Sequence, residues 1–362
     1  MTGPKPACYA AAVQIPDAGP QKLAAAAILA LLDGAPFGRL ATYAPPQGDR
    51  AGRSYVVPLQ FLHSGGVIRL VTTAGRKLTN LRAAPGAACF ALDLTTGDGW
   101  TSVCAWGDYR DVTELGERLD IMAASFSKYP AGTTRQAVSL LRRVAPGGGA
   151  EAERGGRAPV FGRVAIKSMA GRHWPGLLLS AGPALVHPAP PPAPDSPRRP
   201  PERLSRAACR ELLAARPLVR LGCYSPARAR MYCLPLWFES VGDSLWFYHP
   251  PGGAALLAAL REHPQGVCAQ VDNLDCSPAA DPGQPWRSAL AEGVASVHPL
   301  GLDADLPLDV QMTLLRAIRA RLERFAIHSV FVPPDPDLAP PAGALIRLRI
   351  EALSGQATGE PL

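Results

Sequence analysis

Short apolar runs separated by turn residues recur along the chain, a pattern that favours strands joined by tight turns. Residues 21–32 are instead strong helix formers, and Asp33-Gly34 ends that run. In the first half, the pattern predicts helices over 21–32, 76–84 and 115–128, and strands over 38–43, 54–62, 67–73, 87–94, 100–112 and 160–169.

The clearest boundary is the stretch PALVHPAPPPAPDSPRRPP at 183–201, whose proline content is typical of an extended linker. We therefore predict a first domain over 20–174, a linker over 175–203 and a second domain over 204–356.

The second half repeats the first in five ordered matches, so the repeating unit is a whole domain. The matches are LLDGAPFGRLATY with LLAARPLVRLGCY, SYVVPLQF with MYCLPLWF, VIRLVTTAGRKLTNLRAAPGAACFALD with SLWFYHPPGGAALLAALREHPQGVCAQVD, WTSVCAWGDY with WRSALAEGVA, and VAIKSMAG with LRIEALSG. Strands joined by tight turns, without regular strand–helix–strand crossovers, predict a small antiparallel barrel in each half. Two fused copies can pack as a covalent pseudo-dimer. The predicted fold class is mostly β (α+β), with two tandem barrels.

One strand of the first copy runs into a helix that begins with Gly75, Arg76 and Lys77. Backbone amides and cations at a helix N-terminus can hold a phosphate, although the same two cations could simply be solvated on an exposed helix face. The second copy has Gly253-Ala254-Ala255 in this place and lacks the cations. We therefore expect one phosphate site, on the first copy.

The composition is that of a globular chain, with 47% hydrophobic and 19% charged residues. The net charge of +7 comes largely from scattered arginines, whereas nucleic-acid binders cluster cations with aromatic residues, so no nucleic-acid partner is expected. The eight cysteines form no CxxC pair, which favours reduced thiols, a cytoplasmic location and no metal site. The apolar run at 23–32 is too short to span a bilayer, and no signal peptide or membrane partner is expected.

The motifs RLAT, YVVP, GRKLTNLRAAP, a strand ending in Asp93, and TSVCAWG occur in an order that resembles the FMN-binding split-barrel family. This family includes pyridoxamine phosphate oxidase and the nitroimidazole-resistance type reductases. The resemblance covers 31–109 almost completely and the second half in a more diverged form. The ending AIKSMAGRH also resembles the last strand of the reductase-like branch.

The resemblance implies an FMN site at the interface of the two copies. Phosphate contacts would come from Arg76, Lys77 and Arg82, and hydroxyl groups would come from Thr72 and Thr73. Contacts along the flavin ring would come from Val56, Val57, Pro58 and Leu59, and contacts at its rim from Trp100 and Ser102. Arg39 would supply a further charge. Trp100 and Arg39 could equally be packing residues, and Pro58 could simply mark an edge strand. The second copy would supply the facing wall, with Trp237, Trp246 and His249 as candidates.

These features predict an FMN-dependent oxidoreductase acting on a small organic substrate, with the difficult chemistry supplied by the cofactor. No motif of a serine hydrolase, zinc protease or nucleotide-binding loop is present. Two alternatives stay open: a haem-binding barrel with His173 or His249 as the axial ligand, and a flavin-binding protein without enzymatic activity. The duplication removes the need for a homodimer, and it leaves both a monomer and a homodimer possible.

Overall fold

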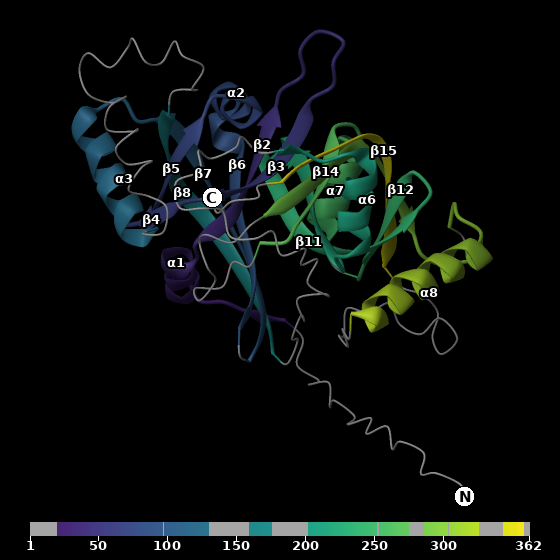
Figure 1. The fold of residues 1–362 in the computed structure, drawn as a ribbon. Coiled ribbons are helices and arrows are strands. Elements are labelled where there is room, and N and C mark those ends of the chain that lie inside the picture. Colours follow the sequence, from purple (N-terminus) through teal and green to yellow (C-terminus); the bar gives the residue numbers. More distant parts are fainter. Residues whose placement is uncertain are drawn as a thin grey trace, which may run out of the picture.

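The computed structural model describes residues 20–96, 98–129, 159–175, 202–251, 253–274, 286–302, 304–325 and 343–357. Figure 1 shows two β-barrels side by side, the first purple to teal and the second teal to yellow. The predicted linker falls almost entirely outside the described residues, so the domain boundaries stay predictions.

The first barrel is an eight-stranded antiparallel sheet in the order β3-β2-β6-β7-β8-β5-β4, with β1 paired to β8. Only Phe61 separates β3 from β4, which pairs with β5 and so brings the two edges of the sheet together. Its strands are β1 (Gln21–Lys22), β2 (Phe37–Ala44), β3 (Arg53–Gln60), β4 (Leu62–Ser64), β5 (Val67–Thr73), β6 (Ala88–Thr96), β7 (Gly99–Asp111) and β8 (Pro159–Pro175). Its helices are α1 (Ala25–Gly34), α2 (Arg76–Ala83), the 3-10 turn η1 (Pro85–Ala87) and α3 (Leu115–Lys128).

The second barrel repeats this topology in the order β12-β11-β10-β13-β14-β15-β9, and a β12–β15 pairing closes a ring of six strands. Its strands are β9 (Glu202–Arg203), β10 (Leu218–Ser225), β11 (Arg230–Val241), β12 (Ser244–His249), β13 (Val267–Asp272), β14 (Arg287–Pro299) and β15 (Ala344–Ala357). Its helices are α6 (Arg206–Ala214), the 3-10 turn η2 (Pro226–Arg228), α7 (Ala254–Glu262) and α8 (Leu308–Arg324). The predicted fold of two tandem barrels, mostly of strands, is confirmed.

Strand β2 is buried on both faces because each face packs against a different core. Leu40 faces the core of the first barrel, whereas Ala41 and Tyr43 belong to a cluster that mixes residues of both copies. Strand β10 takes the same place in the second copy. The rings of Tyr43 and its repeat-equivalent Tyr224 stack with centroids 3.9 Å apart and 6° between their planes. The copies therefore meet in a nearly two-fold symmetric arrangement, as a pseudo-dimer does.

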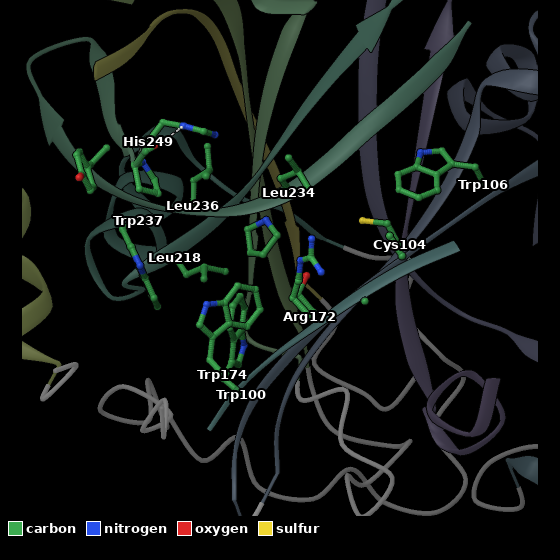
Figure 2. A pocket seen from close by; sticks show the side chains of 16 residues that line it. Trp100, Cys104, Trp106, Arg172, Trp174, Leu218, Leu234, Leu236, Trp237 and His249 are labelled. Atoms are coloured by element: carbon green, nitrogen blue, oxygen red, sulfur yellow. Dashed lines mark hydrogen bonds between the residues drawn. The ribbon is translucent and has the colours of Figure 1, made fainter. Parts of the chain in front are cut away.

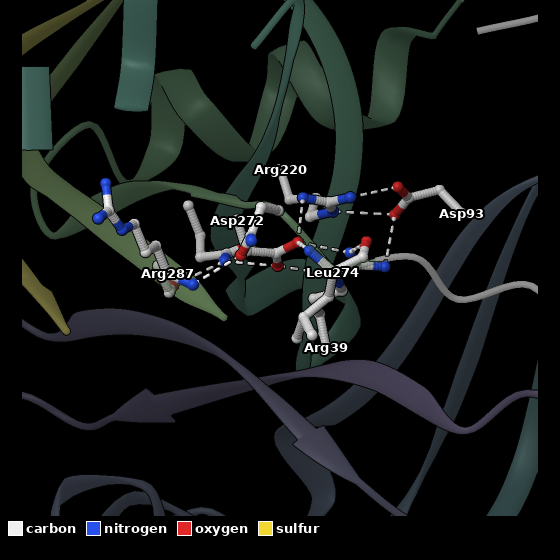
Figure 3. Close-up of polar contacts among 9 residues, drawn as sticks. Arg39, Asp93, Arg220, Asp272, Leu274 and Arg287 are labelled. Carbon is white, nitrogen blue, oxygen red and sulfur yellow. Dashed lines mark hydrogen bonds and ion pairs between the residues drawn. The ribbon is translucent and has the colours of Figure 1, made fainter. Parts of the chain in front are cut away.

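Four buried charged residues cross this interface in two repeat-equivalent pairs (Figure 3). Arg39 donates to Asp272 from Nε at 3.1 Å and from Nη2 at 2.7 Å. Arg220 donates to Asp93 in the same way, from Nε at 2.9 Å and from Nη2. Each arginine also lies close to the other carboxylate, at 3.6 Å for Arg39–Asp93 and 3.5 Å for Arg220–Asp272. We call these four residues the ion cluster.

Both carboxyl groups of the ion cluster stay ionised despite their burial. Burial alone would raise the pKa of Asp272 and of Asp93, but the positive charges of Arg220 and Arg39 outweigh it and hold both pKa values below their usual range. Asp272 also accepts hydrogen bonds from Gln270 Nε2 at 2.8 Å and from the Leu274 amide at 3.1 Å. The lone pairs of its carboxylate are thus satisfied inside the protein, which a buried charge requires.

We predict that Asp272→Asn lowers the free energy of unfolding by about 3–5 kcal/mol, since it leaves two buried guanidinium groups without a full counter-charge. Asp243→Asn is the matched control, because Asp243 is paired with Arg206 and Arg210 on the surface, where a pair contributes about 0–1 kcal/mol. Chemical denaturation of the two variants measures both values. Equal effects would show that the ion cluster does not hold the copies together.

We also predict a loss of stability in acid. The folded pKa of Asp93 and Asp272 lies below the unfolded value, so the stabilisation is present above a pH of about 4 and is lost as the pH falls below it. The denaturation midpoint should therefore drop between about pH 5 and pH 3, and should drop less in Asp272→Asn, which lacks one of the two carboxylates. An equal acid loss in both proteins would contradict this assignment.

Candidate functional site

A cavity of about 250 Å³ lies between the two barrels (Figure 2), close to the lower end of the range for ligand pockets. The first copy forms one wall with β7 and β8, and the second copy forms the other with β10, β11 and the end of β12. The lining residues are Trp100, Ser102, Cys104, Trp106, Ala170, Gly171, Arg172, Trp174, Leu218, Leu234, Pro235, Leu236, Trp237, Tyr248, His249 and Pro250. In Figure 2, Trp106 lies at one end of the cavity and His249 at the other. Neither copy could form this cavity alone.

Indole rings supply flat apolar walls at the middle of the cavity. The Trp100 ring lies 4.6 Å from the Trp174 ring and 6.2 Å from the Trp237 ring, measured between centroids. Residues of α8, including Leu314 and Ile318, belong to the same packed cluster as Trp100 and Trp237. Because these rings are held from behind, the walls are rigid, and a planar aromatic ligand could stack against them.

The open edge of β11 borders the cavity. Trp106 donates from Nε1 to the carbonyl of Met231 at 2.6 Å, and the Cys104 thiol donates to the carbonyl of Cys233 at 3.2 Å. These bonds show that alternate backbone groups of β11 point away from β10 and towards β7. Pro235, two residues after Cys233, follows the same alternation and has no N–H group to leave unsatisfied. Its carbonyl is therefore available to a ligand in the cavity.

Ser102, Arg172, Tyr248 and His249 are among the polar side chains that line the cavity. Burial lowers the pKa of His249, and its Nδ1 donates to the carbonyl of Pro250 at 2.8 Å, so the ring is neutral at pH 7 and Nε2 carries no proton. The imidazole packs directly on Gly253. Any residue other than glycine at this position would place its Cβ only 2.2 Å from Cε1 of His249. Arg172 is thus the charged residue that the cavity offers to a ligand.

The structure divides the predicted site residues between two places. Trp100 and Ser102 line the cavity. The other ten lie on the first copy's side of the interface or on its surface: Arg39, Val56, Val57, Pro58, Leu59, Thr72, Thr73, Arg76, Lys77 and Arg82. The repeat-equivalents of Val57, Pro58 and Leu59 in the second copy are Leu234, Pro235 and Leu236, and these do line the cavity. The cavity therefore takes one wall from each copy, and the roles of these ten residues in cofactor binding stay predictions.

Several of those ten residues already have protein partners. Arg39 is fully buried in the ion cluster. Arg82 pairs on the surface with Asp111, whose Oδ2 lies 2.9 Å from its Nε. Val56 is buried in the cluster shared by both copies, and Val57 and Leu59 pack against the first core.

Arg76, for which phosphate binding stays a prediction, bridges the two copies in this structure. It donates from Nη1 to Oε2 of Glu292 at 2.8 Å and from Nη2 to Oε1 at 2.5 Å. Its guanidinium also lies 4.7 Å from the centre of the Tyr55 ring. The hydrogen bond to Glu292 raises the pKa of Arg76. A phosphate at Arg76 would therefore have to displace a carboxylate.

The histidines named for haem binding lie in different surroundings. His249 lines the cavity. His173 shares a hydrogen bond of 2.9 Å with the Thr101 hydroxyl and is not among the lining residues. Trp237, a candidate for the facing wall, lines the cavity, whereas Trp246 packs beside His298. In the described part of the chain, no group of three or more histidine, cysteine or acidic residues could hold a metal ion.

Sequence reasoning assigned the facing wall to the second copy, but it did not name Leu234, Pro235 and Leu236. The repeat contained the needed signal, because these residues match Val57, Pro58 and Leu59. It also missed Arg172, which lies in the ending AIKSMAGRH.

A family model described as pyridoxamine 5'-phosphate oxidase matches this chain twice, over residues 24–151 and 205–356. The two matches cover more than half of the sequence and confirm both the predicted resemblance and the duplication. None of the curated proteins matches the chain.

Solved structures also resemble single copies of the repeat. An FAD-binding protein from Mesorhizobium loti is 23% identical, with 43% of this chain and 96% of that protein covered and a TM-score of 0.29. The FAD-binding protein from Mycobacterium smegmatis is 21% identical, with 43% and 98% covered and a TM-score of 0.27. The flavocytochrome Anf3 from Azotobacter vinelandii is 21% identical, with 44% and 71% covered and a TM-score of 0.28.

We predict that Arg76→Ala lowers the free energy of unfolding by about 1–2 kcal/mol, because it leaves the partly buried Glu292 without its bidentate partner. Arg82→Ala, which removes a more exposed pair, should cost at most about 1 kcal/mol. The double variant Arg76→Ala/Glu292→Ala should recover part of the loss, as a double-mutant cycle by chemical denaturation would measure. Strict additivity of the two single changes would contradict the bridge.

Proposed function

We propose that this chain, which belongs to the pyridoxamine 5'-phosphate oxidase family, is a flavin-dependent oxidoreductase that binds one FMN in the cavity between its two barrels. The observation that carries the proposal is the cavity itself. Both copies build it, Trp100 and Ser102 line it as expected for the rim of a flavin, and the equivalents of three further predicted residues complete it.

The lining fits the chemistry of an isoalloxazine ring, which is flat and apolar on its faces and polar at one edge. The indoles of Trp100, Trp174 and Trp237 supply stacking surfaces. The Ser102 hydroxyl and the backbone edge of β11 at Pro235 supply polar contacts. These groups bind and orient the ring, and the apolar walls exclude water from its faces.

Arg172 gives the cavity a positive charge without a nearby lining carboxylate. A bound flavin would supply the electron transfer, and Arg172 would supply a positive charge in the cavity that holds it. The neutral His249 accepts a proton only at Nε2, because Nδ1 is bonded to Pro250. The chain's own contribution is thus positioning, electrostatics and exclusion of water.

We place this activity on a small organic substrate and in the cytoplasm. The six cysteines in the described part of the chain are all buried and reduced, which suits a reducing compartment. None of the described helices has both the length and the apolar character needed to cross a bilayer.

The test is the absorbance spectrum and flavin stoichiometry of the purified chain. We predict about one FMN per chain, bound in the cavity that these indoles line. Trp100→Ala should weaken FMN binding at least about tenfold because it removes a stacking surface. Trp286→Ala is the matched control, since it removes the repeat-equivalent indole outside the cavity.

Other outcomes would point elsewhere. Flavin lost from Arg76→Ala/Lys77→Ala but kept in Trp100→Ala would place the cofactor at the phosphate site expected from the sequence. A haem spectrum would favour the haem alternative, with His249 as the histidine that lines the cavity. A chain that takes up neither cofactor would refute the proposal.

A further inference from the structure

The two interface sites differ in where their arginine comes from. Tyr55 and Tyr232 are repeat-equivalent, and a guanidinium lies over the ring of each. Over Tyr55 it is that of Arg76 from α2, at 4.7 Å, and over Tyr232 it is that of Arg230 from the start of β11, at 5.4 Å. The second copy has Ala254 in place of Arg76, yet a cation from another element lies over its tyrosine.

The residue facing each arginine differs as well. Arg76 faces Glu292, and Arg230 faces Trp106, the repeat-equivalent of Glu292, at 4.4 Å from its ring. Both facing residues sit at a β-bulge, at Glu292/Gly293 and at Trp106/Gly107, and a bulge can aim a side chain out of its strand. Glu292 therefore neutralises the charge of Arg76, whereas the equivalent residue that faces Arg230, Trp106, is uncharged.

Polar atoms around Arg230 are buried without partners. Its Nε and the hydroxyl of Tyr232 are both buried and have no hydrogen-bond partner among the described residues, and Tyr232 is only 6% exposed. Among the described residues, no carboxylate forms an ion pair with Arg230. A buried donor without an acceptor costs free energy, so this arrangement favours an anionic ligand that accepts from both groups.

Arg230 is not itself a lining residue of the cavity, but it lies next to Trp106, which is one. It stacks on Trp106, which marks one end of the cavity, and Trp106 is bonded to Met231, the next residue along β11. A ligand that fills the cavity with an aromatic ring could extend an anionic group towards this end.

We propose that Arg230 is the phosphate-binding residue of the flavin site, with the Tyr232 hydroxyl as a second donor. This inference rests on the proposed function and assigns the cofactor phosphate to the second copy. A guanidinium can donate two parallel hydrogen bonds to a phosphate, and stacking on Trp106 and Tyr232 holds its plane in place. The same chemistry applies to the monophosphate of FMN and to the diphosphate of FAD.

The experiment compares FMN, FAD and riboflavin, which share the isoalloxazine ring. FMN carries a monophosphate, FAD carries a diphosphate that links it to adenosine, and riboflavin carries no phosphate. In the full-length chain, Arg230→Gln should raise the Kd of FMN by about 10- to 100-fold and change that of riboflavin by less than about threefold. Tyr232→Phe should show the same selectivity with a smaller loss. Arg53→Gln is the matched control, because Arg53 is the exposed repeat-equivalent of Arg230 and should change neither Kd. The FAD titration shows which of the two phosphorylated flavins the site prefers.

Retained riboflavin binding shows that a variant is folded, so a general loss of structure cannot imitate the expected result. Equal losses for FMN and riboflavin in Arg230→Gln would overturn the inference while leaving the flavin function standing. So would a selective loss of FMN in Arg172→Ala instead, which would assign the phosphate to Arg172. A wild-type chain that binds none of the three flavins would refute the proposed function itself, and this inference with it.

Discussion

The ion cluster at the centre of the molecule sets the relation between the two barrels, and the cavity depends on that relation. Burying four charges is costly unless each carboxylate is bonded to a guanidinium and its remaining lone pairs are satisfied. Arg39 and Asp272 meet this condition only across the interface, as do Arg220 and Asp93. Separating the copies would break the guanidinium–carboxylate hydrogen bonds of both pairs and leave each arginine only with the more distant carboxylate of its own copy. The walls of the cavity, one from each copy, are thereby fixed in place.

Much of this arrangement was predictable because the two copies of the repeat can be compared with each other. The duplicated motifs predicted a strand-rich barrel in each half and the pseudo-dimer that the two halves form. The role of Arg39 was harder to predict, since an arginine in an apolar strand can serve a cofactor or an ion pair equally well. The repeat contains an equivalent arginine, Arg220. An aspartate also ends the equivalent strand in each copy, at Asp93 and at Asp272. Charges present in both copies indicate a symmetric contact, whereas a single cofactor site needs them only once.

The candidate site was predictable only in part, for a geometric reason. A linear motif groups residues of one copy, but an interface site joins β7 and β8 of one copy to β11 and β12 of the other. Trp100 and Ser102 were assigned to the same site as Val57 and Thr72, although their neighbours across the cavity are Leu236 and His249. The pairing register within each sheet follows from alternation along the strands. The docking of one barrel on the other depends on side chains that meet only in three dimensions.

Fusion of the two copies explains why their two interfaces can differ. A homodimer must carry the same residues at both sites, so a change that stabilises one site alters the other as well. In a tandem chain, Glu292 and Trp106 occupy equivalent bulges with opposite consequences: one neutralises Arg76, and the other stacks on Arg230. One interface can then serve stability while the other keeps an aromatic cavity with an available cation. The second copy has Ala254 and Ala255 where the first copy has the cations Arg76 and Lys77. The absence of these two cations is therefore compatible with a cofactor site to which the second copy contributes.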